Sequence, residues 1–179
     1  MGWTILIADD HEIVRKGIRD MIRQFRPEWK VCGEAGSGAE AVEMGKALNP
    51  DVVILDIAMP GMSGIEAASQ LARAHLPCRV LLFTMYESRR LADAAREAGA
   101  QGYVLKSQAA HHLILAIDRI MEGGTFFGSP EANGAADGKT SSGGGPIRCE
   151  GMDARGTLAF PKKRLQKFRW LWPKAGFST

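Results

Sequence analysis

The sequence predicts an α/β domain with five β-strands and five α-helices in alternation, (βα)₅. Short apolar runs alternate with longer segments whose apolar residues recur at steps of three and four. The short runs are typical of strands buried on both faces, and the longer spacing is typical of helices with one buried face. Strands that alternate with helices imply a doubly wound parallel sheet with helices on both faces.

The elements follow one another with clear stop signals. The predicted strands are residues 3–8, 31–34, 52–55, 79–84 and 102–105, and the predicted helices are 13–25, 39–48, 65–74, 91–98 and 113–121. Gly99 and Gly123 stand where helix C-terminal caps are expected. Pro50 and Pro77 follow the second and third helices, which they cannot continue.

Charge and composition divide the chain near residue 129. Residues 1–128 hold 14 Lys and Arg against 16 Asp and Glu, whereas residues 129–179 hold 9 against 4. Only 7 of these last 51 residues are Leu, Ile, Val or Phe, a share typical of disordered chains. We therefore predict a folded domain at 1–128, a Gly/Ser-rich linker at 129–145 and a basic, Trp-containing, disordered tail at 146–179.

Composition also excludes several classes of protein. No apolar run approaches the roughly 20 residues that span a bilayer, and the run that begins at Ile5 ends at Asp9 and Asp10, unlike a signal peptide. Three cysteines without CxxC spacing argue against a disulfide scaffold or a cysteine zinc site. These features predict a cytoplasmic protein.

Five polar residues fall at the carboxyl ends of four predicted strands. Asp9 and Asp10 follow the first strand, Asp56 the third, Thr84 ends the fourth and Lys106 follows the fifth. In a sheet of this kind ligands bind at that edge. A single such residue more often caps a helix or is a solvated charge, but five at one edge favour a functional site.

The residue types at this edge indicate phosphoryl transfer. Clustered carboxylates repel one another and call for a cation, and oxygen ligands suit Mg²⁺. A carboxylate can act as nucleophile and form an aspartyl phosphate. Mg²⁺ and a lysine would neutralise charge on the transferring group, and a threonine hydroxyl can donate to a phosphoryl oxygen.

Four strings resemble the receiver domain of bacterial response regulators. They are ILIADD at 5–10, VILDIAMPGMSG at 53–64, LFT at 82–84 and GYVLK at 102–106, and the resemblance covers about residues 3–124. It implies a flavodoxin-like fold with strand order 2-1-3-4-5. It also implies that Asp56 accepts a phosphoryl group from a histidine kinase. Asp10, Asp56 and the Ala58 carbonyl would ligate Mg²⁺, with Asp9 acting mainly through a metal-bound water.

The resemblance further implies a conformational switch. Thr84 and Lys106 would contact the phosphoryl oxygens, and Tyr103 would turn inward when Thr84 moves. The surface of the fourth helix, fifth strand and fifth helix would then change and could support a phosphorylation-dependent homodimer. Tyr103 also has a simpler interpretation, as an ordinary half-buried strand aromatic. Such a protein is a switch with slow self-dephosphorylation, not a metabolic enzyme.

Further strings, HEIVRKG at 11–17, GYVLKS at 102–107 and EGGTFF at 122–127, resemble the NarL/FixJ-type branch of receivers. Many receivers have proline where this chain has Ser107, so no cis-proline is expected there, and Ser107 could cap the last helix.

Members of the NarL/FixJ-type branch carry a helix-turn-helix DNA-binding domain after the receiver. The 51 residues that remain show no such domain, so we expect no DNA binding by this chain.

The alternatives are weaker. A haloacid-dehalogenase-like phosphatase also uses a nucleophilic Asp with Mg²⁺, but needs a second acid at the position of Ala58. A DNA-binding regulator would need the missing output domain.

Residues 161–174 combine six basic residues with Phe168, Trp170 and Trp172, which fits a nucleic-acid contact, a membrane-interface segment or a disordered, non-native tail. We favour the last. His11 is expected at the rim of the site, without a catalytic role.

Overall fold

The computed structural model describes residues 2–85 and 88–127. These residues belong to the first of two units into which the chain divides, Met1–Gly134. The linker and the tail predicted at 129–145 and 146–179 lie outside the described residues. None of the helices in the described ranges is long and apolar enough to cross a membrane.

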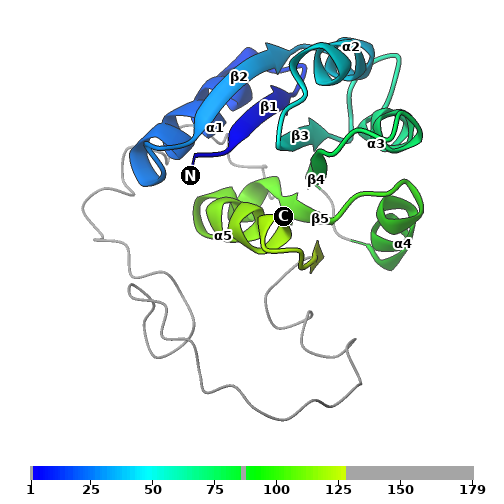
Figure 1. Cartoon of the computed structure of the whole chain (residues 1–179). Coiled ribbons are helices and arrows are strands. Elements are labelled where there is room, and N and C mark those ends of the chain that lie inside the picture. The colour runs from blue at the N-terminus through cyan, green and yellow to red at the C-terminus, as the bar shows by residue number, and fades with distance from the viewer. Residues whose placement is uncertain (1, 86–87, 128–179) are drawn as a thin grey trace, which may run out of the picture. The chain divides into compact units, whose positions relative to one another are not determined.

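A parallel sheet of the predicted order forms the centre of the domain (Figure 1). Its strands run in the spatial order β2-β1-β3-β4-β5-β6, so the predicted order 2-1-3-4-5 is confirmed and a short sixth strand extends it. The strands are β1 (Thr4–Ala8), β2 (Lys30–Ala35), β3 (Val52–Asp56), β4 (Arg79–Thr84), β5 (Gly102–Leu105) and β6 (Phe126–Phe127).

Five helices cover the two faces of this sheet. They are α1 (Glu12–Phe25), α2 (Gly38–Leu48), α3 (Gly64–Arg73), α4 (Arg89–Glu97) and α5 (Ala109–Met121), and a 3₁₀ turn, η1 (Lys106–Gln108), precedes α5. Helices α1 and α5 pack together on one face, while α2, α3 and α4 form the layer on the other (Figure 1). The doubly wound architecture expected from the sequence is thereby confirmed.

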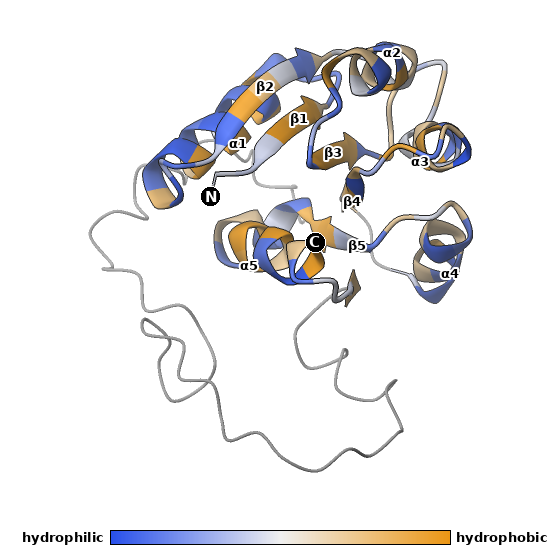
Figure 2. Ribbon diagram, viewed as in Figure 1, coloured by the Kyte–Doolittle hydropathy of each residue, from blue (hydrophilic) through white to orange (hydrophobic). Residues whose placement is uncertain are grey.

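The core lies between each helical layer and the sheet. All five residues of β3 are buried, as expected for a central strand with helices on both faces. In Figure 2 the inner strands are mostly hydrophobic, while the helices show polar residues on their outer sides. Burial on both faces holds the carboxyl ends of β1, β3 and β4 at one edge, which positions the polar residues that follow them.

Local signals define most helix ends. Gly99 and Gly123 adopt positive φ angles of 84° and 90° after α4 and α5, as their predicted capping role requires. The predicted cap at Ser107 is wrong. Residues Lys106–Gln108 form η1 instead, and the N-cap of α5 is Gln108, whose side chain makes no capping hydrogen bond. No cis peptide bond occurs in the described chain, as expected for Ser107 in place of proline.

Candidate functional site

Lys106 joins two buried carboxylates at the carboxyl edge of the sheet. Its Nζ lies 2.6 Å from Asp9 Oδ2 and 2.8 Å from Asp56 Oδ2. All three side chains are almost completely buried, with exposed fractions between 1% and 6%. The ammonium group is also 5.6 Å from the centre of the Phe83 ring. Burial makes these charge-assisted hydrogen bonds stronger than surface ion pairs and makes removal of one partner costly.

The backbone around Asp9 is fixed by the neighbouring strand and by α1. The Asp9 N–H donates to the Ala35 carbonyl at 3.2 Å, and Arg15 Nη1 donates to the Asp9 carbonyl at 2.7 Å. Asp9 Oδ1 accepts the His11 N–H at 2.9 Å, just before α1 begins. The carboxylate is therefore part of the chain turn that leads from β1 into α1.

Asp10 and His11 form the open side of the site. The side chains of Asp10 and His11 are 27% and 66% exposed. His11 Nδ1 lies 2.7 Å from Asp10 Oδ1 and 3.3 Å from Asp9 Oδ1. The structure therefore places His11 at the rim of the site, as the sequence predicted, with its ring in contact with both acids.

The donor set fits a divalent cation. Asp9, Asp10, His11 and Asp56 each offer a ligand atom, and these four atoms lie within 4.8 Å of one another. With all three carboxylates ionised, Lys106 balances one of three negative charges, and a divalent cation would balance the other two. Hard carboxylate oxygens around a partly open position are the ligands that Mg²⁺ prefers.

Burial perturbs the carboxylate at the centre of the site. Loss of solvent raises the pKa of the Asp56 carboxyl above its ordinary value, and the negative charge of Asp9 acts in the same direction. The hydrogen bond and positive charge of Lys106 lower this pKa but do not outweigh burial. The Ala58 N–H contributes a long hydrogen bond of 3.4 Å to Asp56 Oδ1. A cation at this position would favour the ionised form of Asp56.

The loop between β3 and α3 closes tightly around the end of β3. Gly61 has a φ of 76°, in the left-handed region that favours glycine. Gly64 is needed for a different reason: a Cβ there would come within 2.1 Å of the Asp56 carbonyl oxygen. Ser63 caps α3 and Glu66 completes a reciprocal capping box, which anchors the loop beside the site.

Thr84 and Tyr103 lie on the β4–β5 side of the edge. Both are buried, with exposed fractions of 3% and 4%. The Tyr103 ring meets the Phe127 ring edge to face, at 6.1 Å between centroids and an interplanar angle of 70°. Arg96 of α4 stacks on the other ring of this pair, with its guanidinium carbon 4.1 Å from the Phe127 centroid. Tyr103 is therefore more deeply buried than a half-buried strand aromatic, and β6 links it to α4.

Sequence reasoning located the main residues of the cluster but not its supports. Asp9, Asp10, Asp56, Thr84 and Lys106 all lie at the predicted edge. Arg15 and β6 were missed. Arg15 has the spacing of an ordinary exposed helix residue, and β6 has only two residues, too few for a periodic signal.

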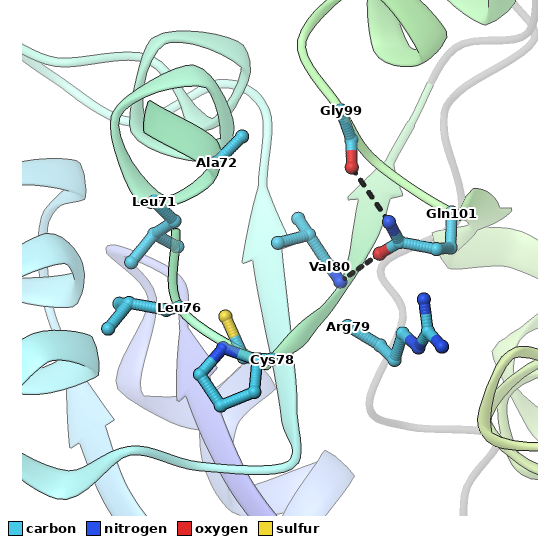
Figure 3. A pocket seen from close by; sticks show the side chains of 9 residues that line it. Leu71, Ala72, Leu76, Cys78, Arg79, Val80, Gly99 and Gln101 are labelled. Atoms are coloured by element: carbon cyan, nitrogen blue, oxygen red, sulfur yellow. Dashed lines mark hydrogen bonds between the residues drawn. The ribbon is translucent and has the colours of Figure 1, made fainter. Parts of the chain in front are cut away.

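A separate pocket lies at the opposite edge of the sheet, where β4 begins (Figure 3). The Gln101 side chain accepts the Val80 N–H at 2.6 Å and donates to the Gly99 carbonyl at 2.9 Å. These bonds use both ends of the Gln101 amide to hold the loop before β5. Cys78 lines the same pocket, and burial raises the pKa of its thiol, which disfavours the reactive thiolate.

Comparison with known proteins shows the family to which the chain belongs. The family described as response regulator receiver domain matches residues 5–118. The response regulator UvrY of Escherichia coli O6:H1 is 35% identical over 126 residues, which are 70% of this chain and 57% of UvrY. The chain thus spans little more than half the length of this curated relative.

Solved structures extend the likeness to the fold. A LuxR-family two-component response regulator from Aurantimonas sp. SI85-9A1 is 38% identical with a TM-score of 0.68, over 73% of this chain and 92% of that one. The signal receiver domain of the NarL regulator from Mycobacterium tuberculosis is 33% identical with a TM-score of 0.64, over 68% of this chain and 98% of that one.

Proposed function

Because the chain belongs to the response regulator receiver family, with relatives of the NarL and LuxR type, we propose that Asp56 accepts a phosphoryl group from a histidine kinase. The observation that carries this proposal is the buried Lys106 ammonium between Asp9 and Asp56, at 2.6 Å and 2.8 Å. A carboxylate nucleophile beside a fixed positive charge is the arrangement that phosphoryl transfer to an aspartate requires.

The transfer exchanges one bond to phosphorus for another. A carboxylate oxygen of Asp56 attacks the phosphorus, while the bond between phosphorus and the imidazole nitrogen of the kinase phosphohistidine breaks. The imidazole leaves with the electron pair. Lys106 neutralises charge on the phosphoryl oxygens, and the Thr84 hydroxyl donates a hydrogen bond to one of them.

Mg²⁺ would supply further neutralisation of the transferring group when bound. Asp10, Asp56 and the Ala58 carbonyl would hold it, with Asp9 acting mainly through a bound water. The remaining step belongs to the chain: Asp9 also keeps Lys106 in place, with Nζ 2.6 Å from Asp9 Oδ2.

The signal would pass through Thr84 to Tyr103. Phosphorylation adds charge and acceptor oxygens beside β4 and draws Thr84 toward them. The buried position of Tyr103 against Phe127 then gains in population over an outward position, and the surface of α4, β5 and α5 changes. This surface would carry a phosphorylation-dependent homodimer, which sedimentation with and without phosphodonor measures.

Labelling with a small phosphodonor tests the proposal. With acetyl phosphate and Mg²⁺, the intact mass of the protein should rise by one phosphoryl group, and Asp56→Asn should abolish this rise. Asp93→Asn, which removes an exposed carboxylate of α4, is the matched control and should label normally. Equal labelling of the wild type and Asp56→Asn would refute the assignment of Asp56.

A further inference from the structure

Arg15 connects the turn of Asp9 and Asp10, which follows β1, to the neighbouring strand β2. Its side chain is 17% exposed and reaches from α1 across the end of β1. Nη1 donates to the Asp9 carbonyl at 2.7 Å, and Nε approaches Glu34 Oε2 of β2 at 3.4 Å. One guanidinium group therefore joins the turn after β1 to the end of β2.

The orientation of the Asp9 carbonyl affects the position of Asp10. This carbonyl belongs to the same peptide group as the Asp10 N–H, so its orientation directs the backbone from which the Asp10 side chain projects. The preceding peptide is held as well, because the Asp9 N–H donates to Ala35. The Asp10 carboxylate itself contacts the exposed ring of His11, a weaker anchor than the buried ammonium that holds Asp9.

We propose that Arg15, oriented by Glu34, is a positioning residue for the divalent-cation site. It fixes the peptide between Asp9 and Asp10 and so presents the Asp10 carboxylate toward Asp56. Partners of metal ligands act in this way by reducing the freedom of the ligands before the ion arrives. This inference rests on the proposed function, since it assumes that Asp10 and Asp56 bind the cation.

The shape of the side chain explains why an arginine stands here. The planar guanidinium presents several N–H donors in a fixed geometry, so it can bond the Asp9 carbonyl and Glu34 together. A lysine ammonium is a single point charge on a flexible stem and would not hold both partners in the same orientation. Arg15→Lys is therefore expected to keep only part of the Mg²⁺ affinity that Arg15→Ala loses.

Arg19 provides a matched control on the same helix. It lies one turn after Arg15 and forms an ion pair with the other carboxylate oxygen of Glu34. Its guanidinium therefore meets the same partner from a position one helical turn farther along α1 than Arg15. Removing Arg19 tests the effect of disturbing Glu34 alone.

Titration of the full chain with Mg²⁺, followed by calorimetry, tests the inference. Arg15→Ala should weaken Mg²⁺ binding about 10-fold. The Mg²⁺ affinity of Arg15→Lys should lie between those of Arg15→Ala and the wild type, and Arg19→Ala should bind Mg²⁺ nearly as the wild type does. The effects of Arg15→Ala and Glu34→Gln should be less than additive in the double variant. Unfolding in EDTA shows whether each variant is folded, and Arg15→Lys decides the question if Arg15→Ala is not.

Labelling rates supply a second readout that a general loss of stability would not move. With acetyl phosphate, Arg15→Ala should need more Mg²⁺ for half-maximal rate but reach the wild-type maximum. Unchanged Mg²⁺ affinity in Arg15→Ala, or an equal loss in Arg19→Ala, would overturn the inference. If the wild type itself bound no Mg²⁺, the proposed function would fail instead, so the two failures are distinguishable.

Discussion

The two halves of the functional edge are held in place by different forces. On the β1–β3 side, Asp9 and Asp56 are bound by Lys106 at 2.6 Å and 2.8 Å, and Arg15 adds a hydrogen bond to the backbone. On the β4–β5 side, Tyr103 is held by the edge of an aromatic ring, and that ring is covered by Arg96. Buried ion pairs and a backbone hydrogen bond therefore support the first half, and aromatic and cation–π contacts contribute to the second.

Under the proposed function, this difference separates phosphoryl transfer from the conformational response to it. Phosphoryl transfer depends on positions fixed before the reaction, which buried charge-assisted hydrogen bonds provide. A switch needs two arrangements of similar free energy, which aromatic packing at the sheet edge allows more readily than a buried ion pair does. Changes in the first half should therefore alter labelling, and changes in the second should alter the response and leave labelling intact.

The largest effect is expected from Lys106→Met. It leaves two buried carboxylates without their positive partner and should lower the free energy of unfolding by about 3 kcal/mol in EDTA. Mg²⁺ should return part of this loss, because it supplies positive charge at the same place. Urea unfolding with and without Mg²⁺ measures both effects.

Lys16→Met serves as the control for Lys106→Met, because Lys16 is an exposed residue of α1. It should change stability little and show no special response to Mg²⁺. A loss in Lys106→Met no larger than in this control would contradict the central role of the buried ion pairs.

A smaller loss is expected from Phe127→Leu. The variant removes the ring that contacts Tyr103 and Arg96 but keeps an apolar side chain in β6. It should cost about 1.5 kcal/mol, from the lost aromatic pair and cation–π contact. Labelling with acetyl phosphate should proceed at the wild-type rate, and a strongly reduced rate would break the separation between the two halves.

The same two halves differ in how far the sequence predicted them. Asp9, Asp56 and Lys106 were predicted because parallel strands bring their carboxyl ends to one edge whatever the details of packing. Tyr103 was placed on its strand, but its partner in β6 was not foreseen. Two consecutive phenylalanines show no period, so their pairing with β5 follows only from the path of the chain after α5.

Local signals failed where tertiary contacts decided the outcome. Ser107 has the chemistry of a helix cap, yet η1 intervenes and the helix begins after Gln108. Arg15 lies in a helix whose other arginines face solvent or surface acids. Its role depends on the distance between α1 and the end of β2, which no spacing in the sequence reveals.

Ser63→Ala tests the anchor of the loop beside Asp56. Loss of the cap should cost about 1 kcal/mol, whereas Ser69→Ala, on the same helix beyond the cap, should cost much less. Hydrogen bonds from Ser63 lower the pKa of Glu66, so the contribution of this acid to stability is present above the ordinary glutamate pKa and lost as pH falls through the lowered value. The difference in free energy of unfolding between Ser63→Ala and Ser69→Ala should therefore become smaller at acid pH.

The smallest expected effect is the pH dependence that Asp56 adds to the metal-free protein. Burial raises the pKa of Asp56, so between its ordinary and raised values the folded chain holds a proton that the unfolded chain has released. Stability due to this group therefore falls as pH rises through that window. Asp56→Asn should remove this fall in urea unfolding with EDTA, and a constant difference from wild type across the window would contradict it.

The most direct test of the account locates the phosphoryl group itself. Borohydride reduces an aspartyl phosphate to homoserine, and peptide mass spectrometry after labelling with acetyl phosphate and Mg²⁺ identifies the converted residue. We predict conversion at Asp56 and none at Asp9 or Asp10. Conversion at either of those two acids, with Asp56 intact, would contradict the assignment of Asp56 as the phosphoacceptor.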